Sequence, residues 1–124
     1  MDGRPHMMLS GTVLDAPDAN ELAAFYQRLL GWSVIQDEPG WVRLGAPNGG
    51  AGLSFQTEDR YVRPVWPADP GDPQMSVHLD IRVESLDDAS AHAEKAGAVR
   101  ADFQPQDDVR VMLDPDGHPF CLYL

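Results

Sequence analysis

The sequence has little cysteine, few positive charges and no long apolar run. Cys121 is the single cysteine of the 124 residues, which excludes an internal disulfide. No apolar run approaches the roughly 20 residues that a helix needs to cross a bilayer. No charged start followed by an apolar core marks a secretion signal, so we expect a cytoplasmic protein.

Basic side chains are scarce. Nine lysines and arginines stand against 20 aspartates and glutamates, which gives a formal net charge of −11. Binding to nucleic acid or to an anionic membrane requires a basic face, so we expect neither partner. The negative charge favours a cationic ligand, or it serves solubility alone. No Walker loop, dinucleotide fingerprint, zinc cysteine cluster or nucleophile elbow is present either.

What the sequence does contain is an internal repeat. It predicts two similar halves that face each other across a shared cavity. At 43% hydrophobic composition, a chain of this length can build one domain from the two halves. The repeated segments share one offset of 67 positions (78 − 11): Gly11–Leu14 with His78–Ile81, Asp18 with Ser85, Val42–Leu44 with Val109–Val111, and Leu53–Phe55 with Phe120–Leu122.

The first half has the pattern of one strand, one helix and three further strands. A strand-like run at 9–14 precedes Asp18 and Glu21, whose spacing resembles a capping box at the start of a helix. Gly31 is expected to end that helix. The three strands that follow are expected at 32–36, 41–44 and 52–56.

The second half repeats this order. A strand at 76–83 precedes Ser85 and Asp88, which repeat the capping pattern, and Gly97 is expected to end the second helix. The last three strands are expected at 99–103, 109–113 and 120–124. The fold class is therefore α+β, with the order β-α-β-β-β used twice.

A proline-rich segment joins the halves. Residues 57–74 contain prolines at 64, 67, 70 and 73, which prevent a regular helix or a central strand. We expect a linker or a lid there, between module 1 at about 8–56 and module 2 at 75–124. Residues 1–7 are expected to form a flexible tail before a single domain at 8–124.

Several segments resemble one known superfamily. Leu14–Asp18, Leu22–Tyr26 and Leu29–Trp32 are similar to the opening of the vicinal oxygen chelate superfamily, which includes glyoxalase I, bleomycin-resistance proteins and extradiol dioxygenases. His78–Asp80 and Asp114–Leu122 resemble the glyoxalase-like branch of its bacterial members. The resemblance implies two tandem βαβββ modules that form a curved mixed sheet around a cavity, and a homodimer as the common assembly.

The resemblance also implies positions for a metal. Catalytic members of the superfamily hold a divalent metal with one residue from the first and the last strand of each module. In this sequence those positions are Gly11, Ser54, His78 and Cys121. A catalytic zinc or iron site needs about three protein ligands, yet Gly11 has no side chain and Ser54 is a poor ligand. We therefore expect no metal cofactor, with His78 and Cys121 as the weak candidates.

Acidic groups and one imidazole are expected on the concave face. Residues two apart on a strand share a side, so Asp15, His78 and Asp80 should project toward the cavity. His78 either contacts a ligand or forms a hydrogen bond inside the core. Asp80 either pairs with an arginine or faces an open, wet site, because an unpaired buried carboxylate is costly. The candidate arginines are Arg43, Arg82 and Arg110.

Three further residues complete the predicted ligand-binding set. Trp66 lies between Pro64 and Pro67, where it either covers the mouth of the cavity or pins the linker to the sheet. Phe55 either lines the cavity or fills the core. Cys121 is either a nucleophile activated by a neighbouring histidine or a small buried hydrophobe.

Two functions remain open from the sequence. The first is metal-independent binding or sequestration of a small aromatic or cationic molecule, as in the bleomycin-resistance members that the chain resembles. The second is enzymatic: a glyoxalase-like lyase, isomerase or dioxygenase with a reduced metal site, or a metal-free catalyst that uses His78 and Asp80. The scarcity of metal ligands favours the first function.

Overall fold

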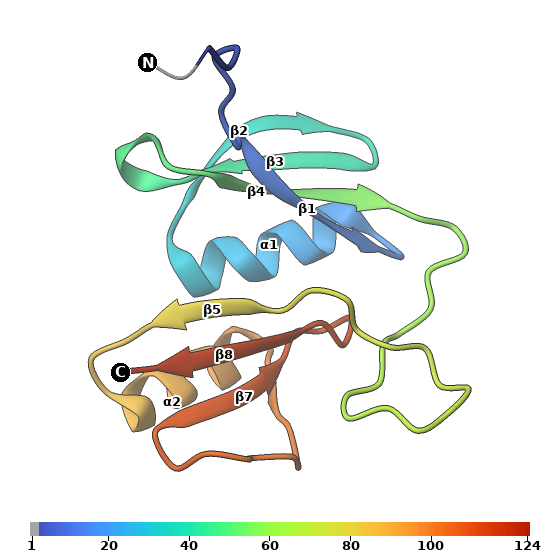
Figure 1. Cartoon of the computed structure of the whole chain (residues 1–124), viewed down its shortest axis with the longest axis vertical. Helices are drawn as coiled ribbons and strands as arrows, with labels where there is room; N and C mark the ends of the chain where they lie inside the picture. The colour runs from blue at the N-terminus through green and yellow to red at the C-terminus, as the bar shows by residue number, and fades with distance from the viewer. Residues whose placement is uncertain (1–2) are drawn as a thin grey trace.

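The structure is a computed structural model that describes residues 3–124. Its elements follow the predicted order of strand, helix and three strands twice (Figure 1), which confirms the α+β fold of two tandem modules. Residues 3–10 form neither helix nor strand. The predicted tail at 1–7 falls partly on residues 1–2, which lie outside the described residues.

The two modules contain nearly the same elements. Module 1 consists of β1 (Gly11–Ala16), α1 (Ala19–Leu30), β2 (Ser33–Glu38), β3 (Trp41–Gly45), the short 3-10 helix η1 (Pro47–Gly49) and β4 (Gly52–Thr57). Module 2 consists of β5 (Leu79–Arg82), α2 (Leu86–Ala96), β6 (Val99–Arg100), β7 (Val109–Leu113) and β8 (Pro119–Tyr123). β5 and β6 are shorter than predicted, so His78 lies directly before β5 rather than within it.

Each sheet places its first strand beside its last. The strand orders are β1-β4-β3-β2 and β5-β8-β7-β6. The first and last strands of each module are parallel, and the other neighbours are antiparallel. Val13 lies opposite Ser54 in module 1, and Asp80 lies opposite Cys121 in module 2. Both residues of the second pair are 67 positions after their counterparts in the first pair (80 − 13 and 121 − 54). The register of the parallel pairs therefore confirms the repeat.

One strand departs from that offset. Val42 lies opposite Phe55 in module 1, and Leu122 is the repeat equivalent of Phe55. Leu122, however, lies opposite Arg110 rather than Val109, so the predicted equivalence of Val42 and Val109 is wrong by one residue. Neighbouring residues of β7 are buried on both of its faces, so its apolar pattern does not fix the register.

Both helices are capped as the sequence predicts. The Asp18 side chain accepts hydrogen bonds from the backbone N–H groups of Asn20 and Glu21 at 3.0 and 3.3 Å, and Gly31 ends α1 with φ 72°. In module 2, the Ser85 hydroxyl accepts from the backbone N–H of Asp88 at 3.1 Å. Each such cap stabilises a helix by about 1 kcal/mol.

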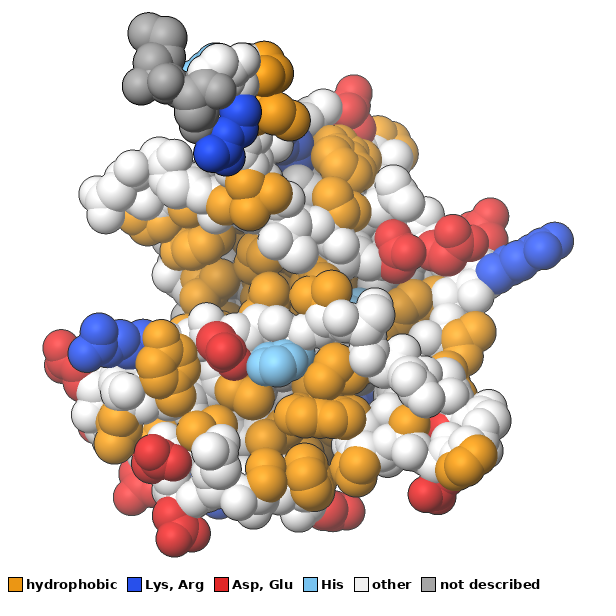
Figure 2. All heavy atoms as spheres, viewed as in Figure 1, with side chains coloured by type: hydrophobic (Ala, Val, Ile, Leu, Met, Phe, Trp, Pro, Cys, Tyr) orange, Lys and Arg blue, Asp and Glu red, His pale blue; other side chains and the backbone are white. Residues whose placement is uncertain are grey.

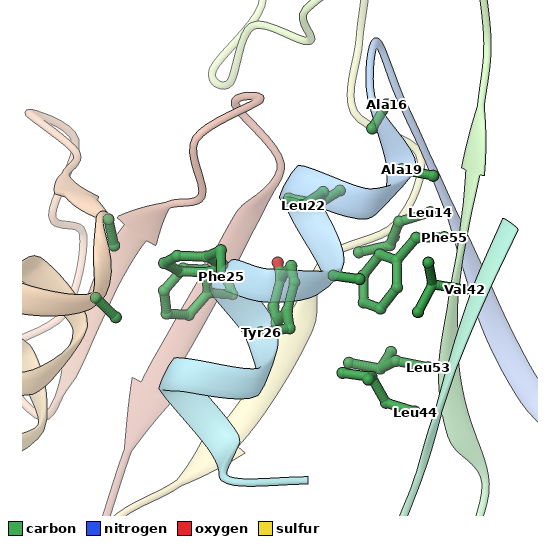
Figure 3. Packing of buried hydrophobic residues seen from close by; sticks show 14 of the residues in the cluster. Leu14, Ala16, Ala19, Leu22, Phe25, Tyr26, Val42, Leu44, Leu53 and Phe55 are labelled. Carbon is green, nitrogen blue, oxygen red and sulfur yellow. The ribbon is translucent and has the colours of Figure 1, made fainter. Parts of the chain in front are cut away.

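The centre of the core comes from α1, which lies between the sheet of module 1 and the strands β5 and β8 of module 2 (Figure 1). Tyr26 stacks on Phe55, with ring centroids 5.4 Å apart, and Phe25 lies 6.2 Å from Phe120. Figure 3 shows Tyr26 on the side of α1 that faces Phe55, and Phe25 on the side toward module 2. Phe55 is fully buried, so it fills the core rather than a cavity.

Apart from Thr57, which ends β4, the linker has no helix and no strand, as its prolines predict. Val65 and Gln74 form an isolated bridge, and the segment between them makes a wide loop beside module 2 (Figure 1). Tyr61 donates a hydrogen bond to the Asp116 carbonyl oxygen at 2.7 Å, which ties the start of the linker to the turn before β8. Neither helix of the described chain is long and apolar enough to span a membrane.

Candidate functional site

The predicted site residues converge on one groove in module 2. The groove has a volume of about 410 Å³ and lies over the face of the sheet that points away from the core. Figure 2 shows a histidine and an acidic side chain next to each other on a largely hydrophobic face. We call this site the module 2 groove; its lining includes Trp66, His78, Asp80, Val109, Val111, Cys121 and Tyr123.

Strand geometry explains why these residues meet. Asp80 lies directly opposite Cys121 on the parallel neighbours β5 and β8. His78 is two residues before Asp80, and Tyr123 is two residues after Cys121, so each pair projects from the same side of the sheet. Leu79, between His78 and Asp80, packs against the core instead. Alternation along two neighbouring strands therefore assembles the groove.

His78 and Asp80 form the polar end of the groove. Nε2 of His78 lies 3.1 Å from Oδ1 of Asp80, and the side chains are 34% and 61% exposed. No described ion pair joins Asp80 to Arg43, Arg82 or Arg110. Of the two alternatives for Asp80, the structure favours the open site over pairing with an arginine. Its carboxylate keeps free acceptor capacity toward the groove.

Trp66 forms an aromatic wall above this pair. Its indole stacks on the His78 imidazole, with centroids 5.6 Å apart and an interplanar angle of 15°. Phe103 meets the indole edge-on at 5.6 Å and 69°. Trp66 therefore both holds the linker against module 2 and lines the groove, which combines the two roles considered for it. The linker places the indole there because the prolines around it stiffen the chain.

Cys121 lies at the base of the groove and is 7% exposed. Burial raises the pKa of its thiol, and the negative charge of Asp80 raises it further. A thiol with a raised pKa is less ionised at neutral pH, so Cys121 is a poor nucleophile as it stands. Of the two roles considered for Cys121, the environment favours the small buried hydrophobe, packed against Ala101 and Val111.

The four metal positions of the superfamily do not come together within this chain. His78 and Cys121 line the module 2 groove, whereas Ser54 lines a separate pocket on the sheet of module 1. A side chain at Gly11 would place its Cβ only 3.2 Å from the Gly52 carbonyl oxygen. The residues present therefore do not fit the four-position metal site.

A smaller donor set does come together. The ligand atoms of His78, Asp80 and Cys121 all lie within 4.8 Å of one another, and no other such group of three occurs in the described part of the chain. Tetrahedral zinc with bonds of about 2.0 to 2.3 Å separates its ligand atoms by about 3.3 to 3.7 Å. A small contraction of the group would therefore give three ligands, with the fourth position open to the groove.

Asp15 lies apart from these residues. It is exposed on β1 and lines a different pocket, between β1, the linker and the segment before β5. The Gln56 amide donates a hydrogen bond to Oδ1 of Asp15 at 3.3 Å. The structure therefore brings together Trp66, His78, Asp80 and Cys121, but not Asp15 or Phe55.

Some lining residues were missed by the sequence analysis. Tyr123 and Val111 line the groove, and the strand pattern could have identified both. Tyr123 is two residues after Cys121 on β8, and Val111 lies opposite Cys121 on β7, so both side chains lie on the face of Cys121. Phe103 lies in the irregular segment after β6, although a strand was expected at 99–103. Its contact with Trp66 depends on how two loops fold against each other.

Known proteins share this fold. The family model of the glyoxalase-like domain matches residues 11–123. A glyoxalase/bleomycin resistance protein/dioxygenase family enzyme from Burkholderia phytofirmans PsJN superposes with a TM-score of 0.72 at 18% identity, over 94% of this chain and 97% of its own. A glyoxalase family protein from Enterococcus faecalis gives a TM-score of 0.65 at 22% identity, over 92% and 94%.

A glyoxalase-related enzyme from Fulvimarina pelagi is similar to the same extent. Its TM-score is 0.67 at 19% identity, over 95% of this chain and 88% of its own. At such low identities the likeness of these structures concerns the fold alone. No curated protein matches the chain.

Proposed function

The chain belongs to the glyoxalase-like domain family, and on this premise we propose that it binds and sequesters a small molecule in the module 2 groove without a metal. The observation that carries the proposal is the groove itself. It combines an aromatic wall at Trp66, a largely apolar floor and a partly exposed carboxylate at Asp80. Ligand sites in proteins commonly have this composition, with a few polar groups that orient a mostly apolar ligand.

The aromatic wall favours a planar ligand. Aromatic rings attract one another in stacked or edge-on arrangements, each worth about 0.5 to 1.5 kcal/mol beyond the burial of area. Trp66 has one ring face against His78 and an edge contact from Phe103. Tyr123 lies on the same groove. A planar aromatic molecule can therefore contact two aromatic side chains at once.

The charge favours a cation. The Asp80 side chain is 61% exposed, and in its described ion pair Oδ1 lies against Nε2 of His78. The other carboxylate oxygen, Oδ2, therefore remains for a ligand. The lining contains no lysine or arginine that would compete for it. With a net charge of −11, the chain also attracts cations over a longer range. We therefore propose an aromatic cation as the ligand class.

A second candidate function is enzymatic and rests on the three donors His78, Asp80 and Cys121. When bound there, a zinc-type ion would supply a Lewis acid that polarises paired oxygens of a substrate. His78 and Asp80 would hold it from one edge of the groove and Cys121 from the base. This is the reduced metal site of the lyase, isomerase or dioxygenase alternative.

We also propose that the protein is a homodimer and is cytoplasmic. β1 and β5 are edge strands, each paired on one side only within the chain. A second copy that pairs along either edge would satisfy its unpaired backbone N–H and C=O groups. Sedimentation of a monomer at micromolar concentration would contradict the dimer.

The free thiol of Cys121 supports a cytoplasmic location.

The functional proposal is tested with a ligand screen on chelator-treated protein, read as thermal stabilisation. Planar aromatic cations should stabilise the protein, planar aromatic anions should not, and the compounds should be recovered unchanged. The Asp80→Asn variant should weaken binding of the cations, and Asp15→Asn serves as the control. Stoichiometric metal in protein purified without chelator, lost in His78→Ala, would instead support the enzymatic candidate.

A further inference from the structure

A second pocket lies outside the module 2 groove and shares no lining residue with it. It has a volume of about 220 Å³, the volume of about seven water molecules in the liquid. Its walls come from β1, from the start of the linker, from the segment before β5 and from the turn before β8. We call it the linker pocket; five polar side chains line it, those of Asp15, Tyr61, Gln74, Ser76 and His118.

The His118 imidazole is held in one orientation by a buried carboxylate. Asp114 is 1% exposed, and its oxygens accept hydrogen bonds from the Tyr26 hydroxyl at 2.7 Å and from the backbone N–H groups of Asp116 and His118 at 2.9 and 3.0 Å. Nδ1 of His118 lies 2.8 Å from the same carboxylate. Because a carboxylate only accepts, Nδ1 carries a proton and donates it. In the neutral imidazole, Nε2 is therefore the acceptor.

No described residue donates to that acceptor. The Tyr61 hydroxyl lies 3.3 Å from Nε2, within hydrogen-bond distance. That hydroxyl donates its one proton to the Asp116 carbonyl oxygen at 2.7 Å. Burial raises the pKa of Tyr61, and the charges of Asp114 and Asp116 raise it further, so the hydroxyl stays protonated. In the neutral tautomer with its proton on Nδ1, Nε2 of His118 is thus an acceptor that receives no proton from Tyr61, on a side chain only 13% exposed in the pocket lining.

The linker pocket also has a negative charge and no positive one in its lining. Asp15 is exposed, and its described hydrogen bond is the 3.3 Å contact from the neutral Gln56 amide. Arg63 lies close by, but its guanidinium donates to the Pro115 carbonyl oxygen and is not part of the lining. The rest of the wall is mixed: Val13 and Val77 are apolar, and Gln74 and Ser76 are neutral and polar.

We propose that the linker pocket is a second ligand site, which takes a small organic ammonium with at least one N–H and a short apolar chain. Asp15 supplies the opposite charge. Nε2 of His118 accepts one N–H, and the valines contact the chain. The proposal is independent of the module 2 groove, since the two sites share neither lining residues nor ligand shape.

The test uses n-butylammonium as the probe and the full chain labelled with ¹⁵N. The titration is carried out at about pH 8. Titration followed by NMR should shift the ring nitrogens of His118 and the backbone amides around Asp15. The signals of His78 in the groove should stay unchanged. n-Butanol, which lacks the charge, and tetramethylammonium, which lacks the N–H, should both bind more weakly.

Variants separate this site from general attraction to an acidic surface. Asp15→Asn keeps the shape of an exposed side chain and should weaken butylammonium about fivefold, as expected for a partly exposed charge contact. The Tyr61 hydroxyl donates to the Asp116 carbonyl oxygen and not to Nε2 of His118, so Tyr61→Phe leaves Nε2 an acceptor and should retain binding. Asp80→Asn in the groove is the matched control and should have no effect. Equal affinity of Asp15→Asn and wild type, or shifts centred on His78, would overturn the proposal.

Discussion

Replacing Asp80 with asparagine should lower the pKa of Cys121. The thiolate form of Cys121 carries a negative charge, and the carboxylate of Asp80 opposes it across the module 2 groove. Asparagine has nearly the same shape but no charge, so the substitution changes the electrostatics of the groove with little change in packing. Burial of the thiol remains, so part of the pKa elevation should persist.

The magnitude follows from the separation of the two groups, which is at most 4.8 Å. Two unit charges at that distance repel by about 0.9 kcal/mol in water and by about 3.5 kcal/mol at an effective dielectric constant of about 20. Since Asp80 is 61% exposed, the value near the lower bound applies. About 1 kcal/mol corresponds to roughly five times more thiolate at a given pH below the pKa.

The assay is a pH titration of thiolate ultraviolet absorbance, with Cys121→Ser versions of each protein as blanks. Asp15→Asn, which removes an equal charge from the linker pocket, is the matched control and should leave the titration of Cys121 in place. A titration that is identical in wild type and Asp80→Asn would show that the two side chains do not share the groove. That result would refute the assembly of the site.

Three further predictions concern stability and are read from urea denaturation. Tyr26→Phe removes the hydroxyl that donates to the buried Asp114 carboxylate at 2.7 Å, and should cost about 1.5 to 3 kcal/mol because the acceptor is charged. Phe55→Ala should cost about 3 to 5 kcal/mol, since the ring is fully buried against Tyr26; a loss below 1 kcal/mol would contradict its place in the core. Wild-type stability should fall as pH rises through the raised pKa of Cys121, because the fold favours the protonated thiol, and Cys121→Ser should remove that part of the pH dependence.

The sequence predicts the fold well wherever local chemistry decides the structure. Asp18 and Ser85 cap the helices with their own side chains, and Gly31 ends α1 in the left-handed region, so these boundaries depend on neighbouring residues alone. The repeat adds the equivalence of the two modules, which the register of Asp80 with Cys121 confirms. These features need no knowledge of how the modules pack.

The parts that the sequence does not predict depend on packing between distant segments. Phe55 is apolar and lies on a strand, so only the position of α1 decides that it faces the core. Asp15 lies on β1 and His78 directly before β5, the first strands of the two modules, yet the modules pack through α1 and leave the two side chains in separate pockets. The stacking of Trp66 on His78 likewise depends on the path of the linker.

The most direct test of the proposed function is the binding of proflavine, a planar aromatic cation, to chelator-treated protein, followed by fluorescence anisotropy. We predict saturable binding without added metal, at least tenfold weaker in Trp66→Ala and about fivefold weaker in Asp80→Asn. Fluorescein, a planar anion, should not bind. Binding that appears only after zinc is restored, or that is equally tight in Trp66→Ala, would contradict a metal-independent site in the module 2 groove.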